Sequence, residues 1–179
     1  EGDREVRIVR FGEGDGALEL RIGFSFVSEK NARENLEAEM LGKSFAEVRS
    51  EATATWNDLL GRIRVEGGTE REKGLFYSSL YRSFLWPALR SDVNGEFTDV
   101  DGKVINPGFR YYTGPSYWDD YRNKLILLGM LAPDVAADVI SSDTDKGEKR
   151  GGFMPTFFHG DHASAFVAGT YLRGNRGFD

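Results

Sequence analysis

The spacing of the apolar residues changes near Ser28, and this change limits the architectures that the chain can adopt. In residues 5–27, apolar and polar residues alternate in two runs, which the glycine-rich residues 12–16 separate. This pattern predicts a strand, a turn and a second strand. Because two isolated strands are only marginally stable, we expect them to belong to a larger sheet. After Ser28 the apolar residues recur every three or four positions, which predicts helices.

Local signals place the helices and the short strands between them. Ser28 suits an N-cap, and Thr69 with Glu72 has the spacing of a capping box. The predicted helices span residues 29–40, 44–60, 70–87, 117–131, 133–141 and 162–172, and the aromatic residues of 70–87 are predicted to be buried in a bundle. A strand is predicted at 62–66, a hairpin at 96–98 and 103–105, and a polar loop at 142–152. Strands followed by helices predict an α+β chain, in which an all-β piece joins an α-helical domain.

The composition excludes several classes of function. The chain has 179 residues, enough to bury a core as one domain or as parts of two. A formal net charge of −6 argues against a nucleic-acid partner, because phosphates require a concentrated basic face. No apolar run reaches the roughly 18 residues of a membrane-spanning helix, so we expect no membrane partner. The absence of cysteine excludes disulfides, thiol catalysis and thiolate zinc sites, and it leaves the cellular compartment undetermined.

Acids, amides and aromatic residues crowd residues 92–122, where the periodicity of a core element is weak. Carboxylates and amides bind sugar hydroxyls, and Trp and Tyr rings stack on the apolar face of a pyranose. Trp118, Asp119 and Arg122 therefore predict a carbohydrate-binding surface where a glycine-containing loop enters a helix. The alternative is that Asp119 and Asp120 only complement the helix dipole, and that Arg122 forms a surface ion pair.

One acidic cluster has part of the pattern of a calcium loop. Asp92, Asn94 and Glu96 have the spacing of its first ligands, but Phe97 occupies the position of the turn glycine. Two turn dipeptides, Asn-Gly at 94–95 and Asp-Gly at 101–102, flank the segment. We therefore predict the hairpin here and no metal site.

The two histidines of the chain, His159 and His162, flank Asp161. Two imidazoles and a carboxylate have the chemistry of zinc ligands, but one short cluster does not supply the geometry of a zinc site. We predict that the histidines form hydrogen bonds to a ligand or to their own loop.

Several segments, in order along the chain, resemble glycoside hydrolase family 92, the calcium-dependent exo-acting α-mannosidases. They are GFSFVSEKNARENLEAE, TWNDLLGRIRVEGGTE, LFYSSLYRSFLWP, SDVNGEFTDVDGKV, YYTGPSYWDDYR and GDHASAFVAGTYLRGNRGFD. The resemblance implies a β-sandwich, linker helices and an (α/α)6 barrel. On this basis residues 1–27 would end the sandwich, residues 28–66 would form the linker helices and a strand, and residues 67–179 would form the N-terminal part of the barrel.

The resemblance also implies a reaction. Members of the family invert the anomeric centre: a carboxylic acid protonates the leaving oxygen, a carboxylate activates water, and calcium holds the mannose hydroxyls. Trp118, Asp119 and Arg122 would line the mannose subsite, and Asp92 and Asn94 would shape its wall. The implied partner is a glycan that contains α-mannose, and the implied cofactor is calcium, with ligands that the sequence does not locate. A secreted, periplasmic or cell-surface location is favoured.

Two departures from the family pattern bear on catalysis. The glutamate that serves as the acid has no counterpart after Glu148, and Asp161 is the one nearby carboxyl candidate. The acid-rich segment with the base would lie beyond Asp179, so we expect a fragment, with the missing barrel half supplied by a longer parent chain and negligible hydrolysis by the chain alone. Two alternatives stay open: a hydrolase of mannosyl-phosphate linkages, whose leaving group needs little protonation, and a non-catalytic carbohydrate-binding or structural module.

Overall fold

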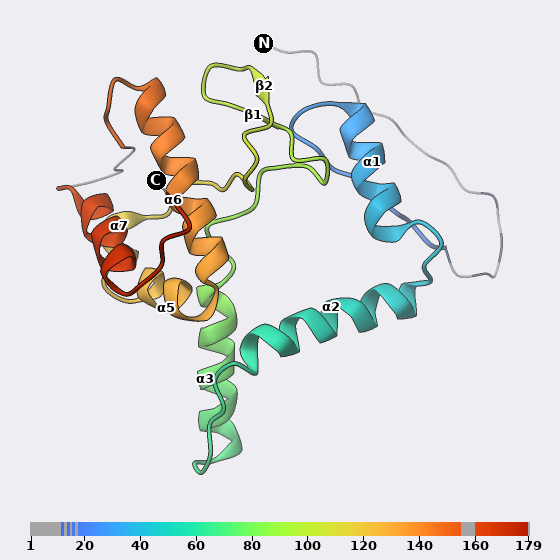
Figure 1. Ribbon diagram of the computed structural model, residues 1–179. Coiled ribbons are helices and arrows are strands. Elements are labelled where there is room, and N and C mark those ends of the chain that lie inside the picture. The colour runs from blue at the N-terminus through green and yellow to red at the C-terminus, as the bar shows by residue number, and fades with distance from the viewer. Residues whose placement is uncertain (1–11, 13, 15, 17, 155–159, 179) are drawn as a thin grey trace.

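The computed structural model describes residues 12, 14, 16, 18–154 and 160–178, and over these residues the chain is mostly helical (Figure 1). The elements are α1 (Glu29–Met40), α2 (Phe45–Leu60), α3 (Glu70–Ser83), β1 (Phe97–Thr98), β2 (Val104–Ile105), α4 (Tyr117–Asp120), α5 (Lys124–Leu131), α6 (Pro133–Lys149) and α7 (His162–Leu172). No helix in the described part of the chain is long and apolar enough to cross a membrane.

A body formed by α4, α5, α6 and α7 holds the hydrophobic core. Helix α6 starts at Pro133, two residues after α5 ends, and contacts it, while α7 packs on α5 and α4 (Figure 1). The buried residues of this core are Tyr112, Tyr117, Leu125, Leu128, Ala132, Ala136, Val139, Ile140, Ala163 and Phe166. Each fully buried Leu, Ile or Phe side chain contributes roughly 1.5–3 kcal/mol. This body therefore supplies most of the apolar burial of the described chain.

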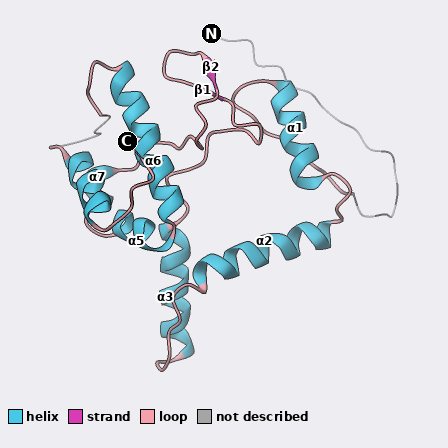
Figure 2. Cartoon of the chain, in the orientation of Figure 1, coloured by secondary structure: helices cyan, strands magenta, loops and turns pink. Residues whose placement is uncertain are grey.

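Helices α1, α2 and α3 contribute little to that core. Helix α1 buries only Asn31, α2 buries none of its residues, and α3 buries only Leu80. Figure 2 shows α2 spanning the distance between α1 and α3. Complete capping boxes start both α2 and α3, and the rings of Trp56 and Tyr81 lie 4.5 Å apart where these helices meet. This part of the chain has little buried surface. It is held by local caps, by the contact between α2 and α3, and by hydrogen bonds from α1 to the loop before β1.

The structure corrects the prediction of strands near the N-terminus. The first predicted run, before residue 12, lies outside the described residues, and residues 18–27 are not a strand. The apolar side chains of this run, from Leu18 to Phe26, are exposed. A strand needs a hydrogen-bonded partner, and the only sheet among the described residues is the two-stranded one of β1 and β2. Without a partner strand, a segment with an alternating pattern does not form a strand.

Residues 62–66 are also not a strand, although their sequence alternates. The hydroxyl of Tyr77 donates to the carbonyl of Ile63 at 3.0 Å and accepts the N–H of Val65 at 3.4 Å. A tyrosine of α3 therefore occupies backbone groups that a neighbouring strand would otherwise pair.

The hairpin prediction is confirmed. Strands β1 and β2 are antiparallel, with Phe97 opposite Ile105 and Thr98 opposite Val104. Gly95 and Gly102, at φ angles of +85° and +77°, occupy the left-handed region that glycine tolerates.

Three helix boundaries differ from prediction. The expected helix 117–131 is broken, because Asn123 leaves the helical conformation and its side chain caps the N–H of Lys124 at 2.6 Å. Helix α3 ends at Ser83, earlier than expected. Helix α6 continues to Lys149 through residues predicted as a polar loop, because Ser142, Asp143 and Lys146 point inward and find partners there.

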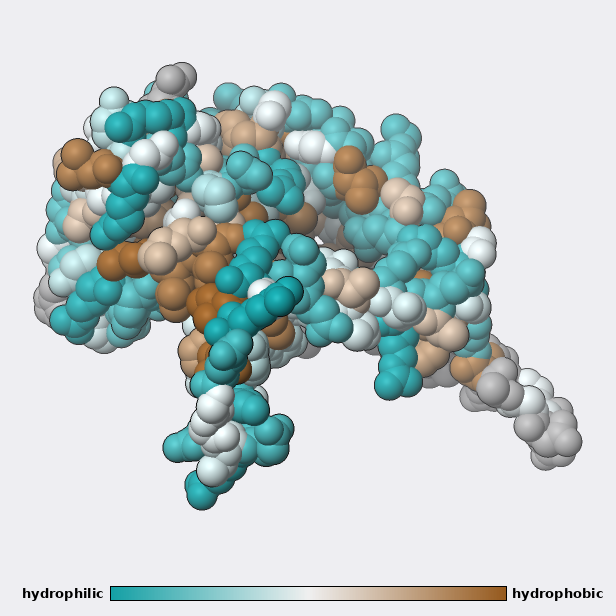
Figure 3. All heavy atoms as spheres, turned by 60° about the horizontal axis from the view of Figure 1, so that its bottom comes forward, coloured by the Kyte–Doolittle hydropathy of each residue, from teal (hydrophilic) through white to brown (hydrophobic). Residues whose placement is uncertain are grey.

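The aromatic residues of α3 and the segment after it are less buried than predicted. Phe76, Tyr81 and Trp86 all keep more than a third of their surface exposed. Figure 3 shows hydrophobic atoms gathered where α3 meets the helical body; in this region Leu85, Trp86 and Leu89 line an open hollow of about 670 Å³. Within the described chain these rings form a surface instead of a bundle interior.

Candidate functional site

The predicted carbohydrate-binding residues lie on and just after α4, a helix of four residues. Tyr117 is buried and starts the helix, whereas Trp118 is 42% exposed. The hydroxyl of Ser116 donates to Asp119 at 3.1 Å, and Lys124 forms an ion pair with Asp120 at 2.9 Å. The segment therefore offers one large exposed ring and an adjacent carboxylate at the surface.

Helix α7 brings a histidine to the same segment. The ring of His162 stacks on Tyr121, with centroids 4.5 Å apart and planes at 13°. The guanidinium of Arg122 lies 5.8 Å from the centre of the same tyrosine ring. The structure thus gathers Arg122 and His162 around Tyr121, a residue that the sequence analysis did not single out. Its position between Asp119 and Arg122, two predicted site residues, is the sequence feature that could have indicated it.

Asp92 and Asn94 lie in a different environment. Asp92 is buried, and its carboxylate accepts hydrogen bonds from Ser25 at 2.6 Å and from Asn35 of α1 at 2.7 Å. Asn94 donates to Glu34 of α1 at 3.1 Å. No residue of α4 takes part in these bonds, and Asp92 and Asn94 join α1 to the loop before β1. Their position at a wall of the mannose subsite stays a prediction.

A buried polar network behind α4 was missed by the sequence analysis. The hydroxyl of Tyr117 donates to Asp143 Oδ2, and Lys146 Nζ donates to Asp143 Oδ1 at 2.7 Å and to the carbonyl of Tyr112 at 2.9 Å. Burial, together with the nearby Asp143 charge, raises the pKa of the Tyr117 hydroxyl. Burial also raises the pKa of Asp143, although Lys146 and Tyr117 act in the opposite direction. Asp143 and Lys146 lie in residues 142–152, which were predicted as a polar loop, so their sequence did not indicate that they are buried.

A comparison of the sequence with known protein families matches residues 31–179 to the catalytic domain of glycosyl hydrolase family 92. The chain belongs to this family.

Solved structures of family 92 share the fold of this chain. A family 92 α-mannosidase from Bacteroides thetaiotaomicron superposes with a TM-score of 0.81 at 29% identity, covering 87% of this chain and 22% of that protein. The same enzyme has been solved with mannoimidazole, with a TM-score of 0.80. A family 92 inverting mannosidase from that bacterium gives a TM-score of 0.79 at 28% identity, again covering 87% of this chain and 22% of the relative.

A curated relative, described as an uncharacterized secreted glycosidase from Arthroderma benhamiae, is 33% identical over 87 residues. This match covers 46% of the chain and 11% of the relative. The chain thus spans about a fifth of the solved family 92 proteins and a smaller share of the curated one.

Asp161, the candidate for the acid, lies at the start of α7. It is the N-cap of α7: its carboxylate accepts the N–H of Ser164 at 3.1 Å and the hydroxyl of the same residue. These two bonds from Ser164 hold the pKa of Asp161 below its usual value. A general acid near neutral pH needs a raised pKa, so the role that this geometry supports for Asp161 is helix capping. His159 lies outside the described residues.

The described residues do not fit the calcium ion that family 92 implies. No group of three or more His, Asp or Glu side chains converges in the part of the chain that the structure describes. Of the acids near α4, Asp120 is paired with Lys124, and the buried Asp143 is paired with Lys146. No step of the reaction can be derived through calcium from these residues.

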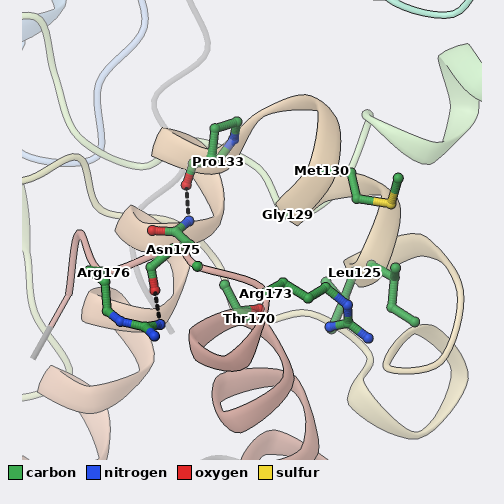
Figure 4. A pocket seen from close by; sticks show the side chains of 10 residues that line it. Leu125, Gly129, Met130, Pro133, Thr170, Arg173, Asn175 and Arg176 are labelled. Atoms are coloured by element: carbon green, nitrogen blue, oxygen red, sulfur yellow. Dashed lines mark hydrogen bonds between the residues drawn. The ribbon is translucent and has the colours of Figure 1, made fainter.

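A separate hollow of about 530 Å³ lies between α5 and the end of α7 (Figure 4). Leu125 and Met130 of α5 line it, together with Arg173 and Arg176 from the chain that follows α7. The side chain of Asn175 closes one edge by donating to the carbonyl of Pro133 at 2.8 Å. None of the predicted site residues lines this hollow.

Proposed function

We propose that this chain forms part of the mannose-binding side of an α-mannosidase that releases mannose from α-mannosides with inversion. Family membership supports the glycosidase class. Two of the solved relatives are mannosidases, one named as inverting and one solved with mannoimidazole. We place mannose binding in this chain because Trp118, Asp119 and Arg122 lie on one surface segment, with His162 beside it. The proposed partner is a glycan with terminal α-mannose.

The proposed roles follow from the chemistry of the side chains. The exposed ring of Trp118 offers an apolar face for a pyranose. Asp119 supplies acceptor oxygens for hydroxyl groups, and Arg122 supplies N–H donors. His162, held by its stack on Tyr121, adds a polar ring nitrogen at the same place.

Recognition alone does not give hydrolysis. Inversion requires an acid and a base whose carboxyl groups lie about 6.5–9.5 Å apart on opposite sides of the anomeric carbon. Asp161 caps a helix and its pKa is lowered, so we do not assign the acid to Asp161, and we assign no base to the described residues. We therefore propose negligible turnover by this chain alone, and calcium dependence stays a prediction of the family. We further propose that residues 67–179 belong to an (α/α)6 barrel, as the family fold implies.

Calorimetry with methyl α-mannoside tests the recognition role. We expect binding by this chain that Trp118→Ala weakens by about tenfold or more, and no binding of methyl α-galactoside. Trp56→Ala, a second partly exposed tryptophan outside the segment, serves as the matched control. No heat with methyl α-mannoside, with and without calcium, would leave only a structural role.

A turnover assay tests the second half of the proposal. Release of the aryl group from an aryl α-mannoside by this chain alone would contradict the absence of a catalytic pair. Parallel incubation with mannose 1-phosphate esters separates the mannosyl-phosphate alternative, since only that activity would release phosphate monoesters. A location outside the cytoplasm is proposed from the name of the fungal relative, and fractionation of producing cells tests it.

A further inference from the structure

The recognition segment, residues 117–122 with Trp118, Asp119 and Arg122, is attached to the helical body through α4 and its contact with α7. Helix α4 has four residues, and its N-cap, Ser116, makes no side-chain hydrogen bond to the helix backbone. A single turn is not stable on its own, because the nucleation cost of a helix exceeds the gain of so few hydrogen bonds. Tyr117 is the one buried residue of α4, at 1% exposure. The next two residues are Trp118 and Asp119, so the placement of Tyr117 contributes to the direction in which both leave the core.

Tyr117 is itself held by charged groups. Its hydroxyl donates to Asp143, which is 0% exposed, and Asp143 is paired with Lys146, which is 8% exposed. The ammonium of Lys146 also holds the carbonyl of Tyr112, on the chain that leads into α4. A buried ion pair is weak evidence for stability, because desolvation offsets its attraction. Its better attested use is to fix one arrangement of the groups around it.

We infer that Tyr117, Asp143 and Lys146 are positioning residues that hold Trp118 and Asp119 in the orientation that binds a mannose ring. The inference rests on the recognition role proposed above. None of these positioning residues needs to touch the sugar. They act through the backbone of α4, which fixes the orientation of Trp118 and Asp119. A fixed orientation raises the affinity and the selectivity for mannose above what mobile side chains would give.

The chain contains a matched comparison for Tyr117. Tyr111 is also buried, at 5% exposure, and its hydroxyl also reaches an aspartate of α6, Asp145, at 3.4 Å. Its ring, however, stacks on Phe97 of the hairpin at 3.6 Å, and not beside α4. Tyr117→Phe and Tyr111→Phe therefore remove the same atom from two tyrosines in similar burial, and only the first lies next to the recognition segment.

The experiment compares these two variants of the chain in three measurements. Calorimetry gives the Kd for methyl α-mannoside, and thermal unfolding gives the melting temperature. Incorporated 5-fluorotryptophan gives a fluorine resonance for each tryptophan, and the one that disappears in Trp118→Phe reports on Trp118. We expect Tyr117→Phe to weaken mannoside binding by about tenfold. It should also shift or broaden the Trp118 resonance while the resonance of Trp56, on α2, stays unchanged.

Tyr111→Phe should leave the Kd and the Trp118 resonance as they are, whatever it does to the melting temperature. A lower melting temperature in Tyr117→Phe, with both other measurements unchanged, would overturn the inference and make the network structural only. If the unmodified chain does not bind methyl α-mannoside, the recognition role fails separately. The fluorine spectrum then decides: an unchanged Trp118 resonance in Tyr117→Phe overturns positioning, and a shifted one supports it.

Discussion

Asp99 and Lys149 form an ion pair at 3.0 Å that joins the β-hairpin to the last turn of α6. The same carboxylate accepts the backbone N–H groups of Asp101 and Lys103 at 2.9 and 2.8 Å. Lys149 also reaches Asp145, one turn earlier on α6, at 2.9 Å. One carboxylate therefore closes the turn of the hairpin and attaches that turn to the helical body.

This arrangement predicts a loss of stability in acid. Burial would raise the pKa of Asp99, but the bonds from Lys103, Lys149 and Asp101 outweigh it and hold the pKa below its usual value of 3.8. A carboxyl whose folded pKa is depressed contributes stability that is present above its unfolded pKa and is lost as the pH falls through its folded pKa. The melting temperature should therefore drop below about pH 4, and Asp99→Asn should lower it at neutral pH and reduce this acid dependence.

Thermal unfolding between pH 2 and pH 7 measures the effect of Asp99→Asn. Asp101→Asn is the control, because its side chain is exposed on the same turn. Equal melting curves for the two variants across this range would contradict the role given to Asp99.

Two glycines of the hairpin region predict unequal responses to the same substitution. Gly95 and Gly102 have similar positive φ angles, +85° and +77°, so alanine at either position costs about 1–2 kcal/mol in backbone strain. A Cβ at Gly95 would also lie 2.9 Å from the side-chain oxygen of Asn106, whereas nothing lies within 4 Å of one at Gly102. Gly95→Ala should therefore reduce the free energy of unfolding more than Gly102→Ala, as urea titration can measure. Equal losses would mean that Asn106 moves aside without cost.

The buried pair of Asp143 and Lys146 predicts strong coupling between two substitutions. Removing either partner leaves the other buried without its counter-charge, so Asp143→Asn and Lys146→Met should each cost about 3–5 kcal/mol in unfolding free energy. The double variant should lose clearly less than the sum, because it leaves no charge unpaired. Urea unfolding of the four proteins measures this cycle. Additive losses would show that the two charges do not depend on each other.

Features that depend on neighbouring residues in the sequence were predicted best. The N-cap of α1 by Ser28 and the capping box of Thr69 and Glu72 are present, and α7 has the predicted bounds. These signals are local, since a capping side chain and the backbone N–H group that it binds lie within four residues of each other. The strand at 18–27 was wrong for the opposite reason, because a strand depends on a partner that the local sequence does not contain.

The candidate site divides in the same way. Trp118, Asp119 and Arg122 were proposed from residue type and family pattern, and their role in binding mannose stays a prediction. Asp143 and Lys146 could not be found, because they become core residues only through Tyr117 and Tyr112, which lie 26 and 34 residues away in the sequence. A charged stretch in the sequence predicts a solvated loop unless its distant partners are known.

The last prediction separates two roles of Asp161. As the N-cap of α7, it should tolerate Asp161→Asn, because asparagine caps as well, whereas Asp161→Ala should cost about 1 kcal/mol in unfolding free energy. As a general acid, it would lose its function equally in both variants, because neither side chain donates a carboxyl proton. Urea unfolding should therefore rank Asp161→Asn near the unmodified chain and Asp161→Ala below it. In a protein that carries this chain and hydrolyses α-mannosides, Asp161→Asn should keep most of the activity at neutral pH; a loss of several orders of magnitude with unchanged stability would instead assign the acid to Asp161.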